Sequence, residues 1–111
     1  MPSLRQLVPW LVLPATELFQ LGHAYDFTLR VTSVRRSQQE QARLYQAYVE
    51  GRSSLPAAPP GRSAHQRGLA FDMARPGVEP LQDPLLFELG RIWLEAGGFW
   101  FAKDPVHFEV R

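Results

Sequence analysis

Two short runs of the sequence contain side chains that can bind a metal ion. Residues 61–73 include His65 and Asp72, and residues 103–109 include His107. Two imidazoles and one carboxylate form the type of ligand set that holds a catalytic zinc ion while one position stays open for water. We therefore expect one zinc ion (Zn2+) per chain at these three residues, although the same ligand types also suit other divalent ions.

Three further polar residues can act beside such an ion. Asp104 lies three residues before His107, and the proline between them cannot donate to a strand ladder, so we expect Asp104 beside the metal rather than bound to it. Its carboxyl group can transfer protons during metal-assisted hydrolysis. Arg36 can bind a substrate carboxylate or stabilise an oxyanion, and Ser63 can offer its hydroxyl group to the substrate.

Each of these residues also has a purely structural interpretation. His65 and Asp72 can form a structural hydrogen bond. Asp104 can be a turn residue before proline, and Arg36 can be an ordinary surface charge. For Glu109 we favour an exposed strand position over a contact with the nearby histidine.

The composition limits the classes of protein and of metal site. The chain has 111 residues, of which 45% are hydrophobic, and this predicts a single domain, residues 1–111, with one core. The 12 basic and 11 acidic residues give a net charge of +1, so we expect no nucleic-acid binding. The sequence contains no cysteine, which excludes disulfides, thiolate nucleophiles and cysteine-ligated zinc sites.

The apolar stretch of residues 7–13 contains Pro9 and is followed by Pro14. It is shorter than the roughly 18 residues that a membrane-spanning helix needs, and it has no convincing signal-peptide cleavage site. We therefore expect it to pack in the core, without membrane insertion. The expected location after synthesis is the cytoplasm of the producing cell.

The periodicity of apolar residues predicts both helices and strands. The predicted helices cover residues 14–25, 37–50 and 84–96, and the predicted strands cover residues 27–34, 68–74, 99–102 and 106–110. His23 falls in the first helix, where we expect it to be partly exposed and without a ligand role. The Gly-, Ser-, Ala- and Pro-rich residues 51–60 are predicted to form a loop.

Residues at the helix ends support these boundaries. Ser37 and Glu40 have the spacing of a capping box, and Asp83 before a proline is typical of an N-cap. Gly51 is expected to end the second helix. That helix should bury three side chains, those of Tyr45, Tyr48 and Val49.

The alternation of side chains along strands places two candidate ligands away from the core. In the predicted strand 68–74, Phe71 points into the core and Asp72 points away from it. In the predicted strand 106–110, His107 also points away from the core. The two side chains can therefore face a common site.

The position of His65 requires a turn. His65 precedes Asp72 by seven residues, an odd number, so a continuous strand would place them on opposite faces. We therefore expect His65 on a loop that turns back near Gly68, because glycine adopts turn conformations readily.

Three motifs resemble those of one peptidase family. The run SAHQRGLAFDM, residues 63–73, resembles the S-x-H-x-x-G-x-A-x-D signature of zinc D-Ala-D-Ala carboxypeptidases and L-Ala-D-Glu endopeptidases of the VanY and phage-endolysin kind, peptidase family M15. The run DPVHFE, residues 104–109, resembles the closing acid-x-x-His motif of that family, and RRSQQEQ, residues 35–41, resembles its R-S-x-x-x-Q element. Together the motifs cover the chain from about residue 34 to its end.

The resemblance implies a small α+β fold of the Hedgehog and DD-peptidase kind, in which helices flank an antiparallel sheet. It also implies a role for each matched residue: zinc ligation for His65, Asp72 and His107, acid/base catalysis for Asp104, and substrate binding or transition-state stabilisation for Arg36 and Ser63.

The aspartate at position 104 favours the L-Ala-D-Glu endopeptidases, since the carboxypeptidases often carry glutamate there. We therefore expect a monomeric zinc metallopeptidase that hydrolyses the stem peptide of bacterial peptidoglycan. Like an endolysin of phage or prophage origin, it would reach the cell wall after release. One alternative is a D-Ala-D-Ala carboxypeptidase or dipeptidase, and another is a non-catalytic module that binds zinc or wall peptide.

Overall fold

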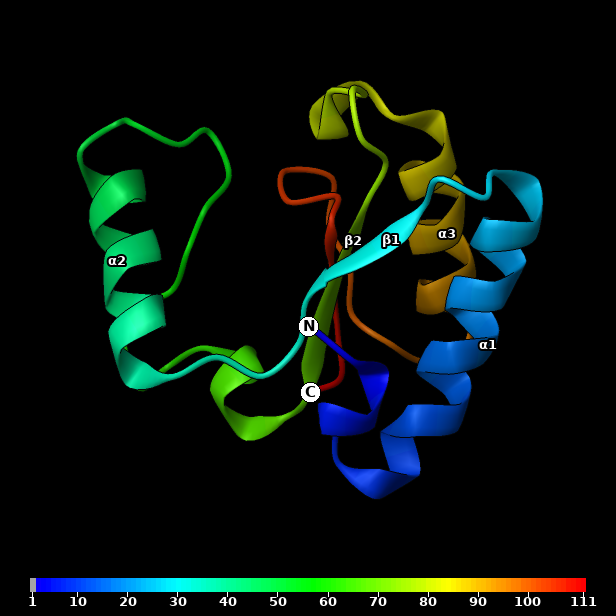
Figure 1. Cartoon of the computed structure of the whole chain (residues 1–111), viewed down its shortest axis with the longest axis horizontal. Coiled ribbons are helices and arrows are strands. Elements are labelled where there is room, and N and C mark those ends of the chain that lie inside the picture. Colours follow the sequence, from blue (N-terminus) through cyan, green and yellow to red (C-terminus); the bar gives the residue numbers. More distant parts are fainter. Residues whose placement is uncertain (1) are drawn as a thin grey trace.

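The computed structural model describes residues 2–111, which adopt an α+β fold (Figure 1). The α-helices are α1 (Pro9–Tyr25), α2 (Gln38–Val49) and α3 (Pro84–Glu95), and the strands are β1 (Arg30–Ser33), β2 (Ala70–Ala74) and β3 (His107–Glu109). The short 3-10 turns are η1 (Leu4–Gln6), η2 (Ala64–Arg67) and η3 (Pro80–Gln82). Helices flank a small antiparallel sheet, so the predicted fold class is confirmed.

The central strand of the sheet is β2. It pairs antiparallel with β1 on one side and with β3 on the other. In the register of β2 and β3, Phe71 lies opposite Phe108 and Asp72 lies opposite His107. Because directly opposed residues on adjacent strands share a face of the sheet, the register brings two of the predicted ligands together.

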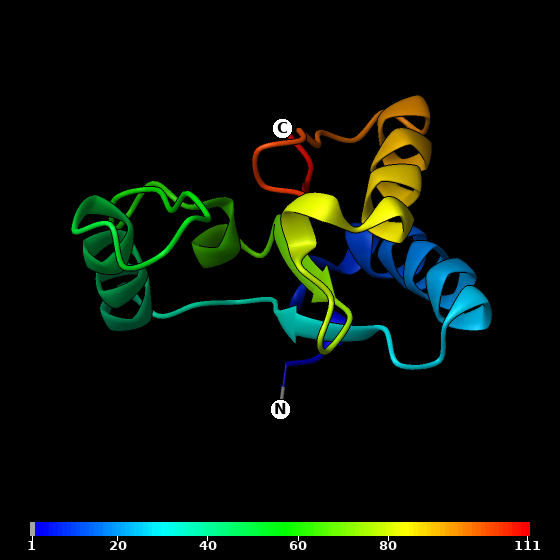
Figure 2. The same ribbon diagram turned by 90° about the horizontal axis from the view of Figure 1, so that it is seen from above.

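α1 and α3 lie together on one side of the sheet (Figure 2). The rings of Phe71 and Phe108 stack with their centroids 5.5 Å apart, and the Trp93 ring from α3 meets Phe71 edge-on at 5.4 Å. Aromatic contacts of this kind add to the free energy gained by burial. The buried apolar cluster consists of Leu7, Leu11, Ala15, Leu18, Leu29, Val34, Phe71, Met73, Leu85, Leu86, Leu89, Trp93, Trp100, Val106 and Phe108.

α1 begins at Pro9 and not at Pro14, so the predicted start of this helix was wrong. Pro14 lies inside the helix, where a proline removes one backbone hydrogen bond. Burial of one helix face outweighs this cost. The buried residues of α1 recur at three- and four-residue steps and are Leu11, Ala15, Leu18 and Gly22.

The apolar stretch of residues 7–13 contributes to the core only in part. Leu7 and Leu11 are buried, whereas Leu13 is 66% exposed. His23, farther along α1, is exposed, and its lack of a ligand role stays a prediction. Within residues 2–111, the structure contains no helix with the length and apolar character needed to cross a membrane.

The ends of the helices follow the predicted capping residues. Ser37 Oγ accepts a hydrogen bond from the Glu40 N–H at 3.1 Å, and Asp83 Oδ1 accepts one from the Leu85 N–H at 2.9 Å. Gly51, just beyond α2, has a φ of 75°, a conformation that favours glycine. Local sequence therefore determines where α2 and α3 begin and where α2 ends.

α2 stands apart from α1 and α3 (Figures 1 and 2), and its predicted burial was wrong. Tyr48 and Val49 are 43% and 59% exposed, and Tyr45 is half-buried. Gln41 is the buried residue of this helix. Within residues 2–111, no side chain of α2 belongs to the buried apolar cluster, and α1 and α3 pack on the opposite side of the sheet.

The predicted strand 99–102 does not form within the described residues. Phe99 makes one isolated bridge to Glu109. The next residue, Trp100, is 9% exposed and packs against Gly90 so closely that a Cβ there would lie 2.2 Å from the indole ring. Burial of this large side chain against α3 takes the chain away from the sheet, so the ladder ends after one bridge.

Candidate metal centre

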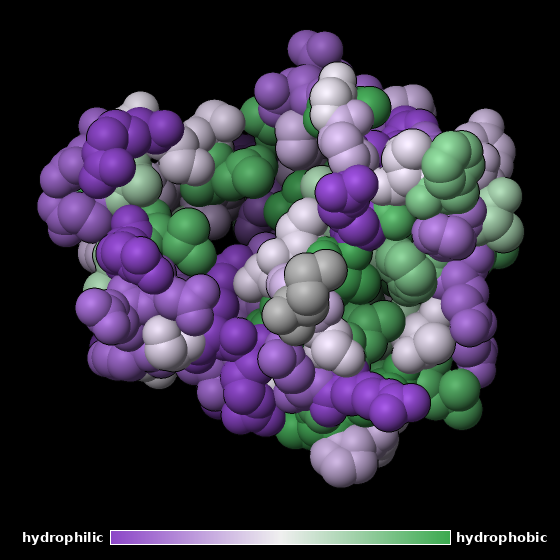
Figure 3. All heavy atoms as spheres, in the orientation of Figure 1, coloured by the Kyte–Doolittle hydropathy of each residue, from purple (hydrophilic) through white to green (hydrophobic). Residues whose placement is uncertain are grey.

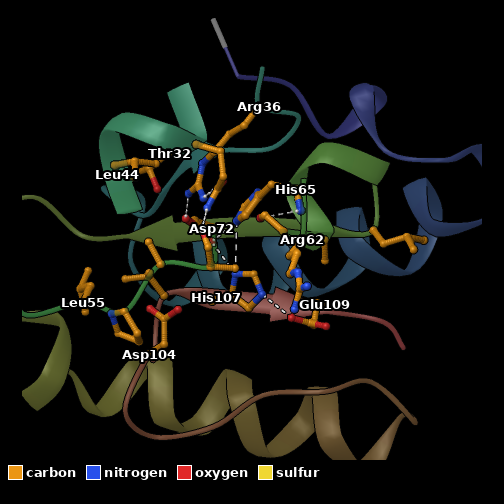
Figure 4. A pocket seen from close by; sticks show the side chains of 18 of the residues that line it. Thr32, Arg36, Leu44, Leu55, Arg62, His65, Asp72, Asp104, His107 and Glu109 are labelled. Atoms are coloured by element: carbon orange, nitrogen blue, oxygen red, sulfur yellow. Dashed lines mark hydrogen bonds and ion pairs between the residues drawn. The ribbon is translucent and has the colours of Figure 1, made fainter. Parts of the chain in front are cut away.

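The side chains of His65, Asp72 and His107 converge on one point (Figure 4). His65 Nε2 lies 2.9 Å from Asp72 Oδ1 and 3.2 Å from His107 Nδ1, and the last two atoms are 3.2 Å apart. His65 and Asp72 are buried, with exposed fractions of 1% and 7%. The three residues that the sequence indicated as metal ligands therefore meet in one place.

Ser63 and Gly68 hold the turn that carries His65. Ser63 Oγ accepts a hydrogen bond from the His65 N–H at 3.2 Å and caps η2. Gly68 ends η2 with a φ of 70°, a left-handed conformation that strains other residues. A Cβ at this position would also lie 2.5 Å from Arg35 Nη2. The turn expected near Gly68 is confirmed, and it brings His65 over Asp72.

The hydrogen bonds of His65 direct a lone pair toward the centre. His65 Nδ1 lies 2.5 Å from the carbonyl oxygen of Val34, so this nitrogen must carry the proton that it donates. In a neutral ring, Nε2 then presents a lone pair to Asp72 Oδ1. The lone pairs of His65 Nε2 and Asp72 Oδ1 then face each other at 2.9 Å and repel. A cation between the two atoms, either a proton or a metal ion, removes this repulsion.

The spacing of the three atoms suits a tetrahedral metal ion. Zinc–nitrogen and zinc–oxygen distances of roughly 2.0–2.1 Å place neighbouring ligand atoms about 3.3 Å apart in a tetrahedron. The observed separations of 2.9, 3.2 and 3.2 Å would need only small outward shifts. Because the donor atoms are also of the type that zinc takes, these residues fit one zinc ion.

Arg36 holds the second oxygen of Asp72. Its Nη2 donates to Asp72 Oδ2 at 2.7 Å. Its Nε donates to Ser33 Oγ at 2.9 Å, and its Nη1 donates to Gln41 Oε1 at 3.2 Å. Three of the five N–H groups of this guanidinium are thus used within the protein, and two remain for the expected contact with substrate.

Glu109 binds the outer nitrogen of His107, so its predicted exposed position was wrong. Glu109 is 8% exposed, and its Oε1 lies 2.6 Å from His107 Nε2. Arg111 Nε donates to Glu109 Oε2 at 2.9 Å. The prediction failed because this face of β3 forms part of a cleft and does not open directly to solvent. A carboxylate on the outer nitrogen fixes the ring and directs Nδ1 toward the centre.

The charges at the centre are strongly coupled. Burial alone would raise the pKa of Asp72, but His65 and His107 outweigh it and hold that pKa well below its usual range. Burial alone would lower the pKa of His107, but hydrogen bonds to Asp72 and Glu109 raise it to about 10. Because a metal ion must replace the proton on His107 Nδ1, metal binding is expected to weaken as the pH falls.

Asp104 lies beside the three converging residues and is not one of them (Figure 4). Burial raises the pKa of its carboxyl group, and the negative charge of Asp72 raises it further, to about 6. A carboxyl group that titrates near neutral pH can both accept a proton and return it. The location agrees with the position expected from the sequence.

A cleft of about 910 Å³ opens over the centre. One wall is formed by α2 and the loop that follows it, and Figure 3 shows a hollow between this wall and the rest of the molecule. Ser63 lies in the lining of the cleft. In Figure 4, Leu44 and Leu55 lie to one side of His107 and Arg62 lies to the other. The cleft therefore extends beyond the metal centre in two directions.

A sequence model of the VanY family, described as D-alanyl-D-alanine carboxypeptidase, matches residues 5–97 of this chain. The chain belongs to this family. The match includes His65 and Asp72 and ends before Asp104 and His107. The third member of the metal centre in this VanY-family chain is therefore supported by its position in the structure. A search of curated proteins gave no sequence match.

Solved structures share the fold of this VanY-family chain. The LdcB LD-carboxypeptidase has a TM-score of 0.69 and 23% identity, with 94% of this chain and 65% of that chain covered. The vancomycin-resistance D,D-dipeptidase VanXYg has a TM-score of 0.68 and 19% identity, with 94% and 50% covered. The L,D-carboxypeptidase DacB from Streptococcus pneumoniae has a TM-score of 0.62 and 23% identity, with 87% and 62% covered. The chain spans only 50–65% of the length of these three relatives.

Our interpretation of the sequence assigned no role to Gln41, although this residue ends the run RRSQQEQ, which resembles the R-S-x-x-x-Q element of the peptidase family. Gln41 is fully buried, accepts from Arg36 and donates through Nε2 to the Ala58 carbonyl oxygen at 2.8 Å. It therefore connects the metal centre to the loop that walls the cleft. The motif spacing was the signal that could have identified it.

Proposed function

We propose that the protein is a zinc-dependent peptidase that hydrolyses the stem peptides of bacterial peptidoglycan. The observation that carries this proposal is the convergence of His65, Asp72 and His107 in a cleft, with Asp104 beside them. Membership in the VanY family supports the reaction class. We propose His65, Asp72 and His107 as the zinc ligands.

Asp104 is proposed as the group that moves protons. When bound, zinc supplies Lewis acidity, which lowers the pKa of a water molecule and polarises the substrate carbonyl. Asp104, as a carboxylate, accepts a proton from the attacking water and later donates it to the amine nitrogen of the leaving group. Its pKa of about 6 suits both transfers near neutral pH.

Arg36 and Ser63 are proposed to support the reaction from the cleft wall. Arg36 fixes Asp72 through its second oxygen and retains two N–H groups that can stabilise negative charge on the substrate. The Ser63 hydroxyl accepts from the His65 N–H, and its own proton remains free to be donated to the substrate. Both residues lie in the lining of the cleft.

The bond between L-Ala and D-Glu is the proposed cleavage site. An endopeptidase must accommodate substrate on both sides of the scissile bond, and the cleft continues on both sides of the centre (Figure 4). The aspartate at position 104 agrees with this choice, because L-Ala-D-Glu endopeptidases of the endolysin kind carry aspartate there.

A second function is removal of a C-terminal residue from the stem peptide. The family description, D-alanyl-D-alanine carboxypeptidase, favours it, as do the neighbours that are named L,D-carboxypeptidases and a D,D-dipeptidase. A carboxypeptidase must bind the terminal carboxylate of its substrate, which an endopeptidase does not need to do.

Mass analysis of digested cell-wall sacculi tests these proposals. We expect the zinc-loaded protein to create new D-Glu amino termini, and we expect Asp104→Asn to create none while it retains zinc. Loss of single D-Ala residues would instead support the carboxypeptidase. If neither protein produced new termini, the non-catalytic binding module would replace both enzymatic proposals.

A further inference from the structure

Arg62 extends into the cleft near the metal centre. Figure 4 shows its side chain pointing toward His107 and Glu109, on the other side of His107 from Leu55. Arg62 lies immediately before Ser63, on the segment that leads into η2. It is exposed, so its guanidinium can meet a ligand that enters the cleft.

Hydrogen bonds fix the backbone on which Arg62 stands. The Arg62 N–H donates to the Pro59 carbonyl oxygen at 3.1 Å. The preceding Gly61 N–H donates to Gln66 Oε1 at 2.6 Å, and Gln66 Nε2 donates to Gln38 Oε1 on α2 at 2.8 Å. The segment is therefore tied to both η2 and α2, which holds Arg62 at a defined place over the cleft.

Arg62 differs from two other arginines of the cleft in having its guanidinium uncommitted. Arg36 donates to three protein groups. Arg111 donates to Glu109, and its guanidinium also lies 3.5 Å from the centre of the Phe99 ring. For the Arg62 guanidinium, residues 2–111 provide neither an ion pair nor a hydrogen bond at contact distance.

Two carboxylates of the cleft, those of Asp72 and Glu109, already have cationic partners. Asp72 contacts Arg36 and both histidines of the centre. Glu109 contacts His107 and Arg111. A free guanidinium in such surroundings can bind an added carboxylate in the bidentate geometry that arginine favours. Substrate in the cleft would also displace water from Arg62 and so strengthen the contact.

We propose that Arg62 is a specificity-determining residue that binds a carboxylate of the stem peptide. This inference rests on the proposed function. An unamidated stem pentapeptide carries two main-chain carboxylates, the α-carboxylate of the γ-linked D-Glu and the C-terminal carboxylate. The endopeptidase proposal favours the first and the carboxypeptidase alternative favours the second, and the chemistry that Arg62 recognises is the same in both.

Peptide binding in an Asp104→Asn background tests the role of Arg62 while the peptide stays intact. The probes are N-acetyl-L-Ala-γ-D-Glu-L-Lys-D-Ala-D-Ala, the same peptide with the D-Glu α-carboxylate as carboxamide, and the same peptide with the C-terminal carboxylate as carboxamide. The Kd of each probe is measured by calorimetric titration of the zinc-loaded protein. The same titrations are repeated with Arg62→Gln and with Arg67→Gln, which removes an equal charge from another arginine in the cleft lining.

The free peptide is expected to bind about tenfold more tightly than one of the two carboxamides, a factor typical of a partly solvated charge-assisted hydrogen bond. Arg62→Gln should weaken binding of the free peptide by about the same factor and abolish that preference. One carboxamide should bind more weakly than the free peptide when Arg62 is present and equally well in Arg62→Gln. The carboxylate that this carboxamide replaces is the one that Arg62 binds. Arg67→Gln should retain the preference.

Three outcomes would overturn the role of Arg62: an unchanged preference in Arg62→Gln, an equal loss of preference in Arg67→Gln, or a lack of binding by every protein. Failure of the proposed function has a different signature, because it shows as an absence of new termini from sacculi. A protein that binds the peptide through Arg62 but cleaves nothing would support this inference and reject the enzyme.

Discussion

The metal centre and α2 are held in place by different kinds of contact. His65 and Asp72 lie in a buried network, with exposed fractions of 1% and 7%, on a turn and a strand that the apolar core supports. On α2, Tyr48 and Val49 are 43% and 59% exposed, and the buried residue of the helix is the polar Gln41.

This difference suggests that the two sides of the cleft have different mechanical properties. α2 and its loop are joined to the rest of the molecule by polar contacts, such as Arg36 to Gln41 at 3.2 Å and Gln66 to Gln38 at 2.8 Å, and by the partly buried Leu55, which packs against the core. Segments with few buried apolar contacts open at lower free-energy cost than core strands. The wall of the cleft can therefore adjust to a substrate while the ligand positions stay fixed.

Removal of a ligand side chain should have the largest effect. We expect His65→Ala to weaken zinc binding by more than about 100-fold, because even residues that only support a ligand contribute roughly 10–100-fold. Asp104→Asn should retain zinc and lose about 10²–10⁴-fold in turnover. Tyr48→Ala on α2 should retain both zinc binding and turnover. Metal analysis and peptide release measure these effects, and comparable zinc content in His65→Ala and Asp104→Asn would contradict the assignment.

Truncation in the core should destabilise the protein far more than truncation on α2. Phe108 is fully buried against Phe71, so Phe108→Ala is expected to lower the free energy of unfolding by about 3–5 kcal/mol. Tyr48→Ala should change it by less than about 0.5 kcal/mol. Urea unfolding in the presence of a chelator compares the two variants. Equal losses would mean that α2 packs more tightly than its exposure implies.

Loss of the charge on Glu109 should have an intermediate effect, which is confined to zinc affinity. Glu109→Gln removes the carboxylate that orients His107, so we expect zinc to bind about tenfold more weakly. The matched control is Glu50→Gln, which removes an exposed carboxylate at the end of α2 and should leave zinc affinity unchanged. A competition titration with a zinc-binding dye gives both affinities. Equal affinities in the two variants would leave Glu109 without a role at the centre.

The smallest expected effect lies outside both regions, where Asp26 contacts Arg75. Hydrogen bonds from Thr28 and Arg75 lower the pKa of Asp26 from 3.8 to about 2. Because the folded pKa is the lower one, this contribution to stability is present above about pH 4 and is lost as the pH falls toward 2. Asp26→Asn should therefore be less stable than the wild-type protein near neutral pH, and the difference should shrink below pH 4. Urea midpoints at several pH values test this, and a difference independent of pH would contradict it.

Much of the local structure followed from the sequence because it depends on neighbouring residues. Ser37 and Asp83 cap helices, and Gly68 makes the turn that returns His65 to β2. The burial of Tyr48 was predicted wrongly, since helical periodicity reveals an apolar face but not whether another element covers it.

The sequence by itself determined the donor types of the metal centre, the faces of the strands that carry Asp72 and His107, and the family, through motifs at short spacing. The tertiary structure alone decided that Glu109 binds His107 and that Arg36 donates to three protein groups, whereas the part of the chain that the structure describes provides no ion pair or hydrogen bond for the Arg62 guanidinium. The physical reason is the distance along the chain between the residues that interact. Helix caps and strand alternation depend on residues a few positions apart. The partners of Glu109, Arg36 and Arg62 depend instead on which distant segments the core brings together.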